Sequence, residues 1–131
     1  MAISYAVLNQ VLPSIIDAKF PILIRGRHGI GKSTIVYQIA EQRGLPVVER
    51  RASQMTEGDL LGLPKVEGNV TQWLAPEWLH NACNNPVILF LDEVDRATME
   101  VRQGIFELCD SRKIAGYSLH PDTVIFACVN G

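Results

Sequence analysis

The segment GRHGIGKST, residues 26–34, has the residue types and spacing needed to hold a phosphate group. Gly26 and Gly31 are separated by four residues and are followed by Lys32 and Ser33, which fits the pattern G-x-x-x-x-G-K-[ST]. Glycines let the backbone approach an anion closely, so that successive N–H groups point at phosphate oxygens. We predict that the phosphate contacts come from Gly26, Arg27, His28, Gly29, Ile30, Gly31, Lys32, Ser33 and Thr34.

Two side chains of this loop have specific expected roles. Lys32 would reach the β- and γ-phosphates of a nucleotide, and the Ser33 hydroxyl would ligate Mg²⁺. An apolar run at residues 20–26 precedes the loop, and apolar residues at helical spacing follow it. The free N–H groups and the positive dipole end of such a helix favour the same anion. The segment therefore predicts a site for a magnesium–nucleotide complex.

A second group of reactive residues follows the apolar run in VILFLDEVD, residues 87–95. Asp92 would end a strand at the sheet edge where open α/β folds bind ligands, and would hold Mg²⁺ through a bound water. Glu93 would act on the attacking water as a general base, an effect worth roughly 10²–10⁴ in rate. Asn130 ends the last apolar run and would orient that water or touch the γ-phosphate. These three residues predict hydrolysis of the bound nucleotide.

The elements that must position these residues alternate along the chain. Continuous apolar runs predict strands at residues 20–26, 45–50, 85–92 and 122–130, and helical spacing predicts helices around residues 7–16, 35–40, 77–83 and 101–108. Pro13 is expected to kink or split the first helix, Gly44 to stop the second, and Pro76 to occupy a first helical position. Residues 64–73 predict a β-hairpin that turns near Gly68 and Asn69. Alternating strands and helices indicate a parallel α/β sheet.

Size and composition favour one globular domain. The chain has 131 residues, of which 47% are hydrophobic and 20% charged, and a net charge of −2. That charge gives no indication of bulk attraction to nucleic acid or to an anionic membrane. No apolar run approaches the roughly 18 residues of a membrane span, and no signal peptide is evident. Cys83, Cys109 and Cys128 are too widely spaced for a disulfide framework or a zinc site, so we expect reduced thiols and a cytoplasmic location.

Together these motifs resemble AAA+ ATPases, most closely the MoxR-like branch. The resemblance runs from about Val7 to Gly131, and the matching stretches are PILIRGRHGIGKS, TEGDLLGLP, LFLDEVDRA, RQGIFELCDSRKI and LHPDTVIFACVNG. It implies a three-layer αβα P-loop NTPase fold, the large subdomain of the AAA+ module, around a central parallel sheet. In that family a β-hairpin interrupts the second helix, which fits residues 62–74. Trp73 and Trp78 flank this segment, and we interpret them as packing residues rather than partner contacts.

The resemblance implies binding and hydrolysis of Mg-ATP, coupled to remodelling of a partner protein by a hexameric ring. The residues that carry over by motif position are Lys32, Ser33, Asp92, Glu93 and Asn130. Arg96 matches the arginine of the family's DE-x-x-R stretch, where it would contact a neighbouring subunit, organise the site or form a surface salt bridge. The client is open: a protein complex, a metal-cofactor enzyme or a phage assembly.

Family members continue beyond the position of Asn130 with an arginine finger and a small helical lid. We therefore interpret residues 1–131 as the nucleotide-binding core without its lid. Trans-acting arginines supply about 10³–10⁵ in rate in related sites, so this piece is expected to bind ATP better than it hydrolyses it. One alternative is a nucleotide-gated binding module or assembly subunit with little turnover. The other is a P-loop kinase or a GTPase, although no Asn-Lys-x-Asp motif is present.

Overall fold

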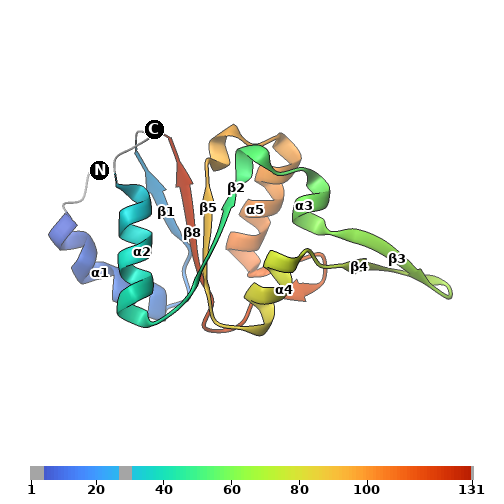
Figure 1. Cartoon of the computed structure of the whole chain (residues 1–131), viewed down its shortest axis with the longest axis horizontal. Coiled ribbons are helices and arrows are strands. Elements are labelled where there is room, and N and C mark those ends of the chain that lie inside the picture. The colour runs from blue at the N-terminus through green and yellow to red at the C-terminus, as the bar shows by residue number, and fades with distance from the viewer. Residues whose placement is uncertain (1–4, 27–30, 131) are drawn as a thin grey trace.

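The central element of the fold is a four-stranded parallel sheet. The structure is a computed structural model that describes residues 5–26 and 31–130 (Figure 1). The strands are β1 (Ile22–Arg25), β2 (Val47–Arg51), β5 (Ile88–Asp92) and β8 (Val124–Val129), in the order β1-β8-β5-β2. Because all four strands are parallel, their carboxyl ends share one edge of the sheet.

Helices cover both faces of this sheet. One face carries α1 (Tyr5–Asp17) and α2 (Lys32–Arg43), and the other carries α3 (Glu57–Leu61), α4 (Glu77–Asn84) and α5 (Met99–Ser111) (Figure 1). A hydrophobic core lies on each face of the sheet, and successive residues of the buried strand β5 belong to different cores. Phe90 packs with α1 and α2, and Leu91 packs with α4 and α5. This explains why its sequence is apolar without alternation. The predicted α/β fold with a parallel sheet is confirmed.

The helix ends follow the sequence signals with two differences. Helix α2 ends at Gly44, which adopts a left-handed φ of 66° and caps the last carbonyls, as predicted. Helix α1 continues through Pro13 as one helix, so the expected split is wrong. Pro76 is the N-cap of α4 and not its first helical residue, because its ψ of 156° is extended.

The predicted β-hairpin is confirmed as β3 (Leu63–Glu67) and β4 (Val70–Leu74), which pair in antiparallel register and turn at Gly68. It extends away from the rest of the molecule between α3 and α4 (Figure 1). At its base Gly62 has a φ of 87°, and a Cβ atom there would lie 1.9 Å from the carbonyl oxygen of Leu74. Only glycine can close the hairpin in this way. Its interpretation as the family's insertion in the second helix stays a prediction.

A second, smaller hairpin was not predicted. Strands β6 (Lys113–Ile114) and β7 (Tyr117–Ser118) have two residues each, too few for a periodic pattern. The Tyr117 hydroxyl donates a hydrogen bond to the carbonyl oxygen of Trp73, which ties the two hairpins together. Trp78 is buried and donates from Nε1 to the carbonyl oxygen of Asp59 at 2.7 Å, in agreement with a packing role. Trp73 on β4 is exposed instead, so its predicted packing role is wrong.

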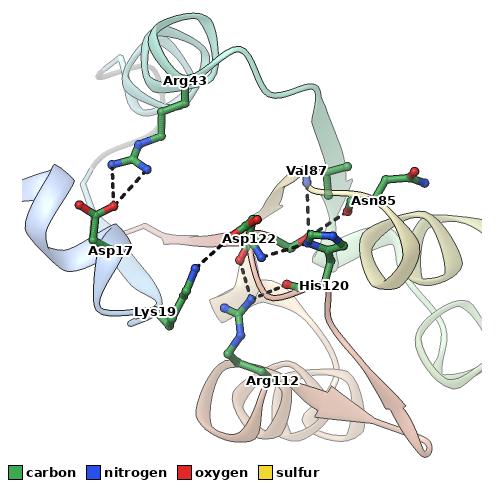
Figure 2. A network of polar contacts seen from close by, with 9 residues as sticks. Asp17, Lys19, Arg43, Asn85, Val87, Arg112, His120 and Asp122 are labelled. Atoms are coloured by element: carbon green, nitrogen blue, oxygen red, sulfur yellow. Dashed lines mark hydrogen bonds and ion pairs between the residues drawn. The ribbon is translucent and has the colours of Figure 1, made fainter.

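A polar network anchors the loop that precedes β8 (Figure 2). Its residues Lys19 and Asp122 precede β1 and β8, so the network lies at the sheet edge opposite the strands' carboxyl ends. The Arg112 guanidinium donates to the carbonyl oxygens of His120 at 2.9 Å and Thr123 at 2.6 Å. Lys19, which follows α1, forms an ion pair with Asp122 at 3.2 Å. These contacts hold the residues before β8 in place. Asn130 follows the last residue of β8 at the opposite edge of the sheet.

Candidate nucleotide-binding site

The predicted site residues meet at the carboxyl edge of the sheet. Arg25 at the end of β1 is paired with Val129 at the end of β8, and Leu91 in β5 is paired with Ala127. Gly26, Asn130 and the pair Asp92 and Glu93 (the acidic pair) therefore lie at the ends of three adjacent strands, at the same edge of the sheet. The remaining loop residues Arg27, His28, Gly29 and Ile30 lie outside the described residues.

Lys32 is the centre of the described hydrogen bonding. It begins α2 directly after Gly31, whose φ of 59° is left-handed, and only 8% of its surface is exposed. The ammonium group donates to the carbonyl oxygens of Gly26 at 3.1 Å and Val129 at 3.4 Å, and to Oδ1 of Asn130 at 2.8 Å. These acceptors are all uncharged. A buried cation with uncharged acceptors at a helix N-terminus creates a favourable environment for an anion.

Asn130 complements Lys32 from the end of β8. Because Lys32 can only donate, the amide oxygen of Asn130 faces it and the amide nitrogen points elsewhere. That Nδ2 atom is buried and has no hydrogen-bond partner among the described residues. Buried donors are normally satisfied, so this one fits an acceptor such as a phosphate oxygen or a water. The residues present therefore suit the phosphate end of a nucleotide.

The acidic pair turns the chain away from the sheet. Asp92 ends β5, and its Oδ1 accepts a hydrogen bond from the Glu93 backbone N–H at 2.8 Å. Glu93 adopts a left-handed φ of 54° and leads into the short 3-10 helix η2 (Val94–Arg96). Burial raises the pKa of the Cys128 thiol to about 12, with the Asp92 charge raising it further and the Lys32 charge opposing. The charges of Asp92 and Lys32 therefore both act on Cys128, which lies in the strand between β1 and β5.

The Glu93 carboxylate is held by residues that were not predicted. Ser53, in the 3-10 helix η1 (Ala52–Gln54), donates to Glu93 Oε2 at 2.6 Å, and Arg51 Nε lies 3.5 Å from the same oxygen. Arg96 Nη1 lies 4.0 Å from Oε1. Pairing of Arg51 with Asp92 across β2 and β5 brings this segment to the site. Because the Arg96 side chain is 61% exposed, this contact fits a surface salt bridge as well as a role in organising the site, and both readings and the contact with a neighbouring subunit stay predictions.

The two residues predicted to hold Mg²⁺, Ser33 and Asp92, follow the glycine loop and end β5. Ser33 and Thr34 are exposed in the first turn of α2, and Asp92 is half-buried at the same edge. Within residues 5–26 and 31–130, no group of three or more His, Cys, Asp or Glu side chains could hold a metal ion. Mg²⁺ commonly uses one or two protein ligands together with phosphates and waters. Ser33 and Asp92 suit that arrangement.

A parallel α/β sheet with a glycine–lysine loop and an acidic strand end at one edge defines a P-loop nucleotide-binding domain. Residues 21–122 match the family model described as AAA domain (dynein-related subfamily). This match covers more than half of the chain, and the chain belongs to this AAA family. It removes the kinase and GTPase alternatives. In the described part of the chain, no helix is long and apolar enough to cross a membrane.

Curated relatives agree with this assignment and confirm the resemblance to MoxR-like proteins. The chain is 35% identical over 94 residues to midasin of Giardia intestinalis, covering 71% of this chain and 2% of midasin. It is 31% identical to CbbQ of Hydrogenophilus thermoluteolus, covering 73% and 36% of the two chains. For NorQ of Paracoccus denitrificans the identity is 30%, covering 72% and 35%. The chain thus spans about a third or less of these relatives.

Solved structures show the same fold. A mutant of RuvB from Thermotoga maritima superposes with a TM-score of 0.66 at 14% identity, covering 98% of this chain and 40% of that one. Another structure of the same protein, described as a Holliday junction branch migration motor, gives a TM-score of 0.63 at 17% identity, covering 98% and 39%. At these identities the likeness shows the fold alone.

Proposed function

We propose that this chain binds Mg-ATP at the carboxyl edge of its sheet and hydrolyses it. The observation that carries the proposal is the joint position of Lys32 and Asn130. Lys32 is a buried cation directly after the glycine loop, and the neighbouring Asn130, after β8, has a buried amide donor with no partner among the described residues. Both groups would interact with the γ-phosphate. This arrangement favours a triphosphate over a ligand without phosphate.

Each residue has a distinct role in this proposal. Lys32 would exchange a carbonyl acceptor for a phosphate oxygen, so that its charge faces an anion instead of a neutral acceptor. Asn130 would donate from Nδ2 to that phosphate or to the attacking water. Glu93 would take the proton of that water. Ser33 and Asp92 would hold Mg²⁺, which when bound neutralises charge on the β- and γ-phosphates.

The proposal extends to a partner-remodelling motor. Residues 1–131 would be the nucleotide-binding core of a cytoplasmic MoxR-like chaperone that forms a hexameric ring, with the arginine finger and lid supplied outside this core. The hairpin β3–β4 projects from the body and exposes apolar side chains, which suits contact with a partner protein. Those side chains are Leu63, Val66, Val70, Trp73 and Leu74. Residues 1–131 alone would hydrolyse ATP slowly.

One observation favours the alternative of a nucleotide-gated binding module with little turnover. The Glu93 carboxylate is held by Ser53 and Arg51 on the side of the site formed by η1. A general base must reach the water from which it takes a proton. If these contacts persist with ATP bound, the protein would bind nucleotide without rapid hydrolysis.

The experiment that tests the proposal compares Glu93→Gln and Lys32→Ala in the full chain. Calorimetric titration with Mg-ATP should show binding by wild type and by Glu93→Gln, and binding at least about tenfold weaker by Lys32→Ala. Turnover should be lost in Glu93→Gln, because the amide cannot take a proton. Glu107→Gln on α5 makes the same chemical change at an exposed glutamate and should behave as wild type. Equal ATP affinity in a folded Lys32→Ala variant would refute the site.

A further inference from the structure

We propose that Asp95 is a positioning residue that holds Asn130 in the orientation in which it contacts Lys32. The inference rests on the proposed function for its effect on turnover. Asp95 lies in η2, just after the acidic pair, and its Oδ1 accepts a hydrogen bond from the backbone N–H of Asn130 at 3.2 Å. It thus joins the turn after β5 to the end of β8.

The end of β8 needs such an acceptor because its neighbour β5 has already left the sheet. The last pair between the two strands is Leu91 with Ala127, whereas β8 continues to Val129 beside β1. The Asn130 N–H therefore lies beyond the β5–β8 ladder. The Asp95 carboxylate takes the place of a strand carbonyl, and a charged acceptor forms a stronger hydrogen bond than a neutral one.

Asn130 is held by two hydrogen bonds, one at its backbone and one at its side chain. The backbone N–H is held by Asp95, and the side-chain Oδ1 receives a hydrogen bond from Lys32 at 2.8 Å. A peptide fixed at its N–H keeps the side chain in one direction, which leaves Nδ2 as the donor for a ligand. Asp95 makes no contact with phosphate in this proposal. It fixes the geometry of a residue that does.

Asp95 is suited to a test because it contributes little to the core. Its side chain is exposed and lines a cavity of about 490 Å³ together with Arg25, Arg102 and Phe106. Substitution there removes no buried apolar surface, so the fold should persist.

The test uses the full chain and three variants. Asp95→Ala removes the acceptor, Asp95→Asn keeps an oxygen that can accept the same N–H, and Asp110→Ala removes one exposed carboxylate elsewhere on the surface. The first measurement is hydrogen exchange of the Asn130 amide without nucleotide. Exchange should be about tenfold faster or more in Asp95→Ala, between wild type and Asp95→Ala in Asp95→Asn, whose acceptor is neutral, and unchanged in Asp110→Ala.

The second measurement is steady-state ATP hydrolysis by the same proteins. Asp95→Ala should lower kcat by about tenfold with KM within about twofold, and Asp95→Asn should recover most of that loss. Unchanged exchange at Asn130 overturns the hydrogen bond. Changed exchange with unchanged kcat, or with Asp95→Asn as impaired as Asp95→Ala, overturns the positioning role. Absence of Mg-ATP binding by wild type overturns the proposed function instead. The exchange measurement, which is made without nucleotide, still tests the hydrogen bond between Asp95 and Asn130 in that case.

Discussion

The hydroxyl of Thr123 is expected to be a major determinant of how β8 is registered against its neighbours. Its side chain is 1% exposed, and Oγ1 lies 2.9 Å from the carbonyl oxygen of Ala82 and 3.1 Å from that of Asn85. The same oxygen accepts a hydrogen bond from the Val87 N–H at 3.3 Å. It therefore joins the end of α4, the start of β5 and the start of β8.

Two substitutions separate this polar role from packing. Thr123→Val keeps the shape but leaves the buried Val87 N–H unpaired, which costs about 1–3 kcal/mol, and we expect about 2 kcal/mol in total. Thr123→Ser keeps the hydroxyl and loses one methyl group, at about 1 kcal/mol. The assay is urea unfolding with the free energy extrapolated to water and the m-value compared between variants. The reasoning is wrong if Thr123→Val is as stable as wild type, or if Thr123→Ser is the less stable variant.

Two further predictions concern the hairpin base and the thiols. Gly62→Ala should destabilise the protein by about 2 kcal/mol or more, measured by urea unfolding, because its φ of 87° and the 1.9 Å approach to the carbonyl oxygen of Leu74 leave no space for Cβ. Burial raises the pKa of Cys109 to about 11 and that of Cys128 to about 12, from 9.0. Both thiols should resist a thiol reagent at pH 8, with half-buried Cys83 reacting first. Since folding favours their protonated forms, stability should fall as the pH rises from about 9 towards 12; stability that stays constant over that range contradicts the shifts.

The strands and the loop could be predicted because each depends on local sequence. The continuous apolar runs of β5 and β8 and the spacing from Gly26 to Lys32 require no knowledge of the partners. The hairpin turn at Gly68 is likewise a local signal. Conversely, β6 and β7 are too short for a pattern and were not predicted, and α1 continues through Pro13, so the predicted split was wrong.

The site was predicted only where its residues follow a motif. Ser53 and Arg51 reach Glu93 because β2 pairs with β5 at the register of Arg51 with Asp92, a contact between segments about forty positions apart. No single sequence reveals such a pairing before the strand order is known. The same holds for Asp95, whose role depends on β5 leaving the sheet before β8 ends.

The most direct test of the account is a single paramagnetic NMR experiment on the ¹⁵N-labelled chain. Mn²⁺ with a non-hydrolysable ATP analogue should broaden the amide resonances of Ser33, Asp92 and Asn130 together, because Mn²⁺ uses the same oxygen ligands as Mg²⁺. Resonances of Lys19 and Asp122, at the opposite edge of the sheet (Figure 2), should stay sharp. Broadening confined to that opposite edge, or broadening that reaches Ser33 but spares Asp92, would contradict a single nucleotide site at the strands' carboxyl ends.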